Sequence, residues 1–110
     1  MTDLESTARA LAALGHEARL TIFRTLVRAG RTGLSIGEIA THTGLAASTQ
    51  AHHLKMLVDA ELVQQKRQGR ETINTAHFQG MDAVISYLTD ECCAGFDTAT
   101  KDAALEGLKP

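Results

Sequence analysis

Two adjacent cysteines near the C-terminus, Cys92 and Cys93, are the only sulfhydryl groups in this 110-residue chain. Neighbouring Cα atoms lie about 3.8 Å apart, whereas ordinary disulfides need at least roughly 4.4 Å, so a bridge between these two residues would be strained. Three other roles stay open: a chelating dithiol, a redox pair, or two packing residues. As ligands, thiolates prefer soft acceptors, and they bind only when deprotonated.

The spacing of apolar residues predicts five helices, and the cysteines lie at the end of the last one. The predicted helices span residues 3–14, 17–29, 35–43, 46–60 and 80–94. Cys92 falls on the apolar stripe of the last helix, which also suits a small buried hydrophobe, while Cys93 lies off that stripe. Because neighbouring helical residues point about 100° apart, we expect the two sulfurs to converge on one atom only if the last helical turn, before Gly95, unwinds.

A tight turn and a hairpin follow the third predicted helix. Residues 43–46 form a four-residue turn before the fourth helix, and Gln68-Gly69 joins strand-like runs over 62–67 and 70–75. Two short helices with such a turn, followed by a hairpin, predict a mainly α fold with a small β-hairpin, the winged helix-turn-helix. This motif reads DNA through its second helix, although it also occurs as a purely structural corner.

The exposed side of the fourth helix carries the candidate base-reading residues. Ser48, Thr49 and His52 face outward at its start. Gln50, on the flank, is expected to reach a base edge because glutamine pairs well with adenine. Candidate phosphate contacts, which position a protein on DNA without reading its sequence, are Lys55, Lys66, Arg67 and Arg70. The last three of these also fit a solvated turn.

Length and charge fit one small domain with a localised phosphate-binding face. Residues 1–95 are expected to form a DNA-binding and dimerisation domain, and residues 96–110 a tail that is either disordered or a short helix. The net charge is −2, yet residues 19–70 carry eight basic residues against three acidic ones, and both flanks are acidic. Such an asymmetry is compatible with a nucleic-acid partner but also with random surface charge.

Other function classes find little support in the sequence. No apolar run approaches the ~18 residues of a membrane span, and the start of the chain lacks a basic, signal-like segment. A cysteine pair at one spot suits a reducing compartment, so we expect a cytoplasmic protein without membrane contact. The chain has no Cys-x-x-Cys spacing, cofactor loop or paired acid and base, and its five histidines form no ligand set. Neither an enzyme nor a structural metal is therefore expected.

In their order along the chain, these motifs resemble the ArsR/SmtB family of bacterial metal- and metalloid-responsive repressors. The similarity covers about residues 8–93, and its main segments are Ala13–Leu20, Leu34–Ala40, Ser48–Leu57 and the hairpin after Leu62-Val63. The resemblance implies a homodimer formed by the first and last helices, which binds a two-fold operator in double-stranded DNA and leaves it when an effector binds. The interface candidates on these helices are Leu4, Leu11, Met81, Val84, Ile85 and Leu88.

The chain departs from two ligand sets of that family. Residues 36–38, where one arsenic-responsive branch places a cysteine pair, contain no cysteine, and residues 78–95, where zinc-sensing members carry histidine ligands, contain no histidine. The run Leu88–Cys93 instead resembles arsenic-responsive members whose cysteines end the last helix. Two smaller departures are Gln50, where an apolar residue is usual, and Ala46, where a capping serine is common.

Trivalent arsenic or antimony is the effector that this match implies. Such an atom accepts up to three sulfurs, and one chain offers two. A methylated or aryl arsenical already carries one carbon and needs only Cys92 and Cys93. Arsenite or antimonite needs a third ligand from a small thiol, hydroxide or the other subunit. A redox- or sulfide-responsive repressor of the same fold and an effector-independent DNA-binding protein stay open as alternatives.

Overall fold

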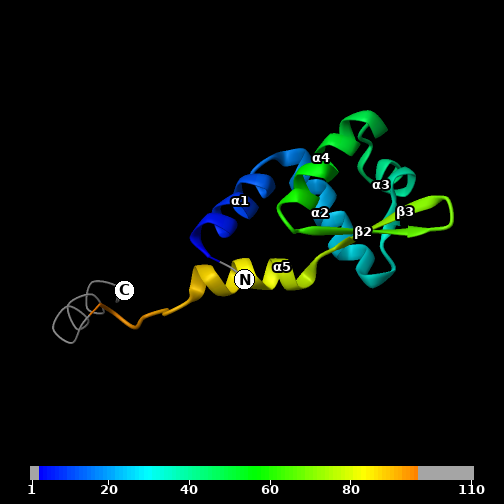
Figure 1. Ribbon diagram of the computed structural model, residues 1–110. Coiled ribbons are helices and arrows are strands. Elements are labelled where there is room, and N and C mark those ends of the chain that lie inside the picture. Colours follow the sequence, from blue (N-terminus) through cyan, green and yellow to red (C-terminus); the bar gives the residue numbers. More distant parts are fainter. Residues whose placement is uncertain (1–2, 97–110) are drawn as a thin grey trace.

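The computed structural model describes residues 3–96, and the predicted tail over residues 97–110 lies outside them. The chain forms five helices and a small sheet (Figure 1). In order these elements are α1 (Leu4–Leu14), α2 (Glu17–Ala29), the 3₁₀ turn η1 (Gly30–Thr32), β1 (Leu34–Ser35), α3 (Ile36–Thr43), α4 (Ala47–Asp59), β2 (Val63–Gln68), β3 (Glu71–Ala76) and α5 (Phe78–Thr89). The predicted winged helix-turn-helix is confirmed: α3 and α4 are its two helices, and the hairpin of β2 and β3 is the wing.

Local capping explains where the helices begin. Asp3 accepts the Ser6 backbone N–H at 2.8 Å at the start of α1. At the start of α3, the Ser35 hydroxyl accepts the Glu38 N–H at 3.2 Å, and the Glu38 carboxylate accepts the Ser35 N–H at 2.9 Å. This reciprocal pair is the capping box that a Ser-x-x-Glu spacing indicates. In contrast, Ala46 leaves α4 without a side-chain cap.

One apolar core lies under the helix-turn-helix and the sheet. It is formed by side chains from every helix and both long strands, among them Ala10, Ala13, Ile22, Phe23, Leu26, Ile39, Leu54, Leu57, Leu62, Val63, Ala76 and Val84. Burying a side chain of the size of Leu or Ile stabilises the fold by about 1.5–3 kcal/mol. The core therefore holds α2, α3 and α4 together and fixes the orientation of the helix that would enter DNA.

The sheet has three antiparallel strands in the order β1-β3-β2. Val63 pairs with Ala76 and Gln68 with Glu71 across the wing, as the Gln68-Gly69 turn predicts. The two-residue strand β1, which the sequence reading missed, lies on the other edge of β3. It thereby joins the wing to the start of α3.

The last helix differs from its prediction. It spans Phe78–Thr89 rather than residues 80–94, because Asp90 turns to an extended conformation (φ −58°, ψ 139°). Glu91 and Cys93 then adopt left-handed φ values of 58° and 63°. Figure 1 shows α5 running beside α1, away from the sheet, with the chain leaving it in an irregular path. Both cysteines therefore lie beyond the helix. No helix among residues 3–96 is long and apolar enough to cross a membrane.

Candidate thiol site and DNA-binding surface

The two cysteines form an exposed dithiol in a turn after α5, residues 90–94, which we call the thiol turn. The Cys92 and Cys93 sulfurs lie 3.3 Å apart. The turn is closed by two backbone hydrogen bonds, from Cys92 N–H to the Thr89 carbonyl and from Ala94 N–H to the Glu91 carbonyl, both 3.0 Å. Cys92 is exposed, so the packing role that its place on a helical stripe would have suited is wrong.

Convergence of the sulfurs does not require a helix to unwind, contrary to the expectation from helical geometry. The left-handed residues Glu91 and Cys93 reverse the chain and bring the sulfurs to one side. A non-glycine residue with a positive φ is uncommon and costs conformational energy. Two such residues around one dithiol are unusual, and they preorganise it as a pair.

The Cys92 thiol affects how readily Cys93 loses its proton. The hydrogen bond to Cys92, together with the charge that Cys92 carries when ionised, raises the pKa of the Cys93 thiol above its usual range. Removing the second proton leaves two negative sulfurs in contact, which the pair resists. A ligand that bonds to both sulfurs removes this repulsion, so the ligand-bound pair is more favourable than the free pair with both thiols ionised. Among residues 3–96, no three His, Cys, Asp or Glu side chains are placed to hold a metal ion.

Three of the predicted base-reading residues are exposed at the start of α4. These residues, Ser48, Thr49 and His52, project from the first turns of the helix. Gln50 does not: it is fully buried, and its Nε2 donates a 2.7 Å hydrogen bond to the Ile36 carbonyl. Its predicted contact with a base edge is therefore wrong, because the amide is used inside the helix-turn-helix.

The predicted phosphate contacts are exposed on α4 and the wing. Lys66, Arg67 and Arg70 surround the tip of the β2–β3 hairpin. Lys55 forms a solvent-exposed ion pair with Asp59 at 3.2 Å. Exposed pairs of this kind contribute little stability, so Lys55 can exchange Asp59 for a phosphate at small cost.

A histidine cluster supports the recognition helix α4 from behind. His53 is 8% exposed, and its Nδ1 accepts a 3.4 Å hydrogen bond from Arg19 Nη1. Its ring lies 4.7 Å from the ring of His16, whose Nδ1 accepts the Ala18 backbone N–H. Burial, followed by the charges of His16, Arg19 and His52, lowers the pKa of His53. The cluster thus joins α4 to the start of α2, in surroundings that disfavour the charged form of His53.

The outer face of α1 and α5 carries an apolar surface, which we call the α1–α5 face. Leu4, Leu11, Ile85 and Leu88 are exposed by 71%, 41%, 51% and 59%. Of the other predicted interface residues, Met81 is half-buried, while Val84 is only 5% exposed. Val84 packs into the chain's own core, so it has almost no surface left to offer a partner, and its assignment to the interface is wrong.

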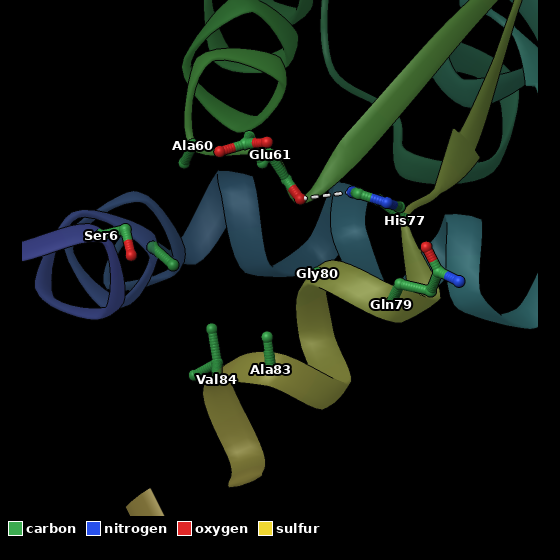
Figure 2. A pocket seen from close by; sticks show the side chains of 9 residues that line it. Ser6, Ala60, Glu61, His77, Gln79, Gly80, Ala83 and Val84 are labelled. Atoms are coloured by element: carbon green, nitrogen blue, oxygen red, sulfur yellow. Dashed lines mark hydrogen bonds between the residues drawn. The ribbon is translucent and has the colours of Figure 1, made fainter. Parts of the chain in front are cut away.

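A cavity of about 230 Å³ lies where α1, α5 and the end of α4 meet (Figure 2). His77 Nδ1 donates a 2.9 Å hydrogen bond to the Glu61 carbonyl across it. A side chain at position 80 would collide with that same carbonyl, so Gly80 permits the close approach. The first turn of α5 is therefore fixed against the segment that follows the recognition helix.

An exposed helix with polar side chains, a basic wing and a buried scaffold behind them define a DNA-binding winged helix-turn-helix protein. Comparison with known proteins agrees, since the family described as "Helix-turn-helix domain" matches residues 14–65. The HTH-type transcriptional regulator YgaV of Escherichia coli is 32% identical over 89 residues, which are 81% of this chain and 88% of YgaV.

Solved structures extend the comparison to the whole fold. The ArsR-like transcriptional regulator from Rhodococcus sp. RHA1 is 27% identical, with a TM-score of 0.74 over 96% of this chain and 91% of that one. A homodimeric winged helix-turn-helix DNA-binding domain from Mycobacterium bovis, a possible ArsR-family regulator, is 26% identical, with a TM-score of 0.63 over 97% and 88% of the two chains. This chain belongs to the ArsR family. It is a DNA-binding transcriptional regulator and not an enzyme.

Proposed function

We propose that this regulator is a homodimeric repressor that leaves a two-fold operator when Cys92 and Cys93 bind a trivalent arsenical or antimonial. The observation that carries the proposal is the 3.3 Å separation of the two exposed sulfurs. Two bonds of about 2.3 Å, the length of a zinc–thiolate bond, meeting at roughly a right angle would place their sulfurs about 3.3 Å apart. The dithiol is thus spaced to chelate one soft atom.

The binding step balances without a further reactant. Methylarsenite, written as CH₃As(OH)₂, exchanges both hydroxyl groups for the two sulfurs, and each thiol proton leaves with a hydroxyl as water. The arsenic then holds one carbon and two sulfurs, which completes its valence. Arsenite and antimonite retain one hydroxyl or take a third thiol. We therefore expect the methylated arsenical to bind most tightly to this two-cysteine site.

Release follows if ligand binding changes how two copies meet. The thiol turn directly follows α5, whose Ile85 and Leu88 lie on the exposed α1–α5 face. A two-fold dimer reads half-sites one helical turn of DNA apart, so a small shift at this face misaligns both recognition helices together. The two arrangements need to differ by only a few kcal/mol for a ligand to select between them.

The DNA-contacting residues complete the proposal. Ser48, Thr49 and His52 read base edges in the major groove, since they are exposed at the start of α4. The basic residues Lys55, Lys66, Arg67 and Arg70 contact phosphates. Gln50 is not among these contacts because its amide is buried.

A band-shift titration with the operator tests this function. Methylarsenite, arsenite and antimonite are each added to the wild-type protein and to Cys92→Ser and Cys93→Ser. The wild type is expected to release DNA, and both variants to bind DNA normally and stay bound. Zinc serves as the control ion. Release from either serine variant would rule out the dithiol as the effector site.

The exposure of both thiols also favours a second function, a thiol-based redox switch. Peroxide would take two electrons and two protons from the pair, giving one disulfide and two waters. A bridge between Cys92 and Cys93 would be strained, so an intersubunit bridge is the better product. A relative of known structure, 26% identical over 81% of this chain, is described as reduced HlyU from Vibrio cholerae. Release by peroxide, with a dimer resistant to denaturant but not to reductant, would favour this function over arsenical sensing.

A further inference from the structure

Three amide side chains connect the wing to the recognition helix through one short segment, Leu34–Ile36. From the wing, Gln65 Nε2 donates to Asn74 Oδ1 at 2.8 Å, and Asn74 Nδ2 donates to the Leu34 carbonyl at 3.1 Å. From α4, Gln50 Nε2 donates to the Ile36 carbonyl at 2.7 Å. The two DNA-contacting elements are thus anchored two residues apart on the same backbone.

That segment is itself held firmly. Its strand β1 pairs with β3, with Leu34 opposite Asn74 and Ser35 opposite Ile73. Gly33 precedes it with a φ of 70°, and a side chain there would collide with the Asn74 carbonyl. The capping box of Ser35 then fixes the first turn of α3. Because strand pairing and the capping box hold Leu34–Ile36 in place, each amide hydrogen bond to this segment fixes the position of the element that carries the amide.

Stability alone does not explain these amides. Gln50 and Asn74 are fully buried, and within residues 3–96 the Gln50 Oε1 atom finds no hydrogen-bond partner. An unsatisfied buried oxygen destabilises a fold, so a methionine or leucine at position 50 would pack at lower cost. A hydrogen bond, however, fixes both distance and direction, which an apolar contact does not.

We propose that Gln50 and Asn74 are positioning residues for DNA recognition, which together fix the angle between the recognition helix and the wing. In this arrangement Ser48 and Thr49 meet base edges while Arg67 meets a phosphate of the same half-site. Loss of either amide leaves every DNA-contacting side chain in place but lets α4 and the wing move independently. The proposal rests on the DNA contacts of the proposed function and is independent of the thiol site.

The test compares specific with non-specific binding in Gln50→Met and Asn74→Leu. The specific probe is an operator selected by the wild-type protein from random double-stranded oligonucleotides, and the non-specific probe is its shuffled sequence. Each variant is expected to lose about tenfold in operator affinity, because base contacts depend on alignment. Affinity for the shuffled duplex should change by less than about twofold, since phosphate contacts carry it.

Thr7→Val is the matched control. The Thr7 hydroxyl is also buried with no hydrogen-bond partner among residues 3–96, but it lies in α1, outside the three-amide connection between the wing and the recognition helix. This variant should bind both probes as the wild type does. Unchanged operator affinity in Gln50→Met and Asn74→Leu, or equal loss on both probes, would overturn the proposal. Melting curves identify any variant that does not fold. If one of the two variants does not fold, the exposed Gln65→Leu replaces it. Its operator affinity is expected to fall threefold (about 0.6 kcal/mol), with no change on the shuffled duplex. Unchanged operator affinity in this variant would overturn the proposal.

Discussion

Two regions of the molecule bury their apolar side chains to different extents. One is the helix-turn-helix with its sheet, residues 17–76, and the other is the layer formed by α1, α5 and the thiol turn. In the first region α2, α3 and α4 pack around fully buried residues such as Leu26, Ile39 and Leu57. In the second, Val84 is the only buried residue of α5. Large apolar side chains on the same helix remain exposed, as does the dithiol that follows it.

This difference separates what one chain can do alone from what needs a second copy. The orientation of the recognition helix is fixed within one chain, because both its apolar core and its amide anchors come from that chain. The α1–α5 face has no such internal partner among the described residues. The effector site proposed at the thiol turn thus adjoins the region that is least fixed by the chain itself.

Breaking the α1–α5 face should have the largest effect. Leu88→Glu removes an apolar contact twice in a two-fold dimer, and each buried leucine contributes about 1.5–3 kcal/mol. We expect monomers by light scattering and at least about a hundredfold loss of operator affinity. Leu20→Glu is the control, since Leu20 is 44% exposed but lies on α2. A stable Leu88→Glu dimer would contradict the assignment of this face.

Core truncation should separate the two regions next. In the monomeric Leu88→Glu background, Leu57→Ala is expected to reduce the free energy of unfolding by about 2–5 kcal/mol, because Leu57 is fully buried. Leu4→Ala in the same background should change it by less than about 0.5 kcal/mol, since Leu4 is exposed. Urea denaturation measures both. Similar losses would show that α1 has its own core.

Acidification should weaken the helix-turn-helix region through His53. Its pKa in the folded chain is lowered, chiefly by burial, so the unfolded chain binds the proton more readily. The stability that depends on neutral His53 is fully present above the ordinary imidazole pKa of about 6.5. It is lost as the pH falls through that value towards the lower pKa of the folded chain. Urea midpoints between pH 8 and pH 5 test this, and His53→Gln should flatten the acid limb. An equally steep loss of stability at low pH in that variant would show that groups other than His53 cause it.

Adding a missing cap should give a small gain in the same region. Ala46 precedes α4 with an extended conformation and no side-chain cap, so Ala46→Ser is expected to stabilise the protein by about 0.5–1 kcal/mol. Ala47→Ser, one position inside the helix, cannot cap and is the matched control. Equal effects of the two substitutions on the melting temperature would argue against capping.

Changing one thiol should alter reactivity and leave the fold unaffected. The pKa of Cys93 is raised first by its hydrogen bond to Cys92, so Cys92→Ala should lower that pKa and speed the alkylation of Cys93 by iodoacetamide at pH 8. The melting temperature should not change, because both side chains are exposed. Slower alkylation in the variant would mean that Cys92 activates its neighbour.

Much of the fold could be predicted from local patterns, and the errors have identifiable causes. Helical periodicity located all five helices, and the Gln68-Gly69 pair located the wing. The early end of α5 was missed because left-handed Glu91 and Cys93 carry no glycine signal. The strand β1 has two residues, too few for a period, and is defined only by its pairing with β3.

The site residues were predicted less completely because their burial depends on distant contacts. Gln50 has a polar side chain on the flank of an amphipathic helix, which indicates exposure, and only the Ile36 carbonyl fourteen residues earlier explains its burial. Val84 shares its helical stripe with Ile85 and Leu88, but of these three residues only Val84 is buried in the core. Spacing gives the face of a helix, and not which partner occupies that face.

The thiol turn has a further consequence for how such regulators diversify. Its closing hydrogen bonds are all internal to residues 89–94, so replacing Asp90, Glu91 or Ala94, or adding a donor atom nearby, leaves the helix-turn-helix unaltered. If the dithiol is the effector site, as proposed, its ligand selectivity can be changed by substitutions in this segment alone, without changing the recognition helix. For the design of whole-cell biosensors, six residues at the end of α5 are the segment to randomise.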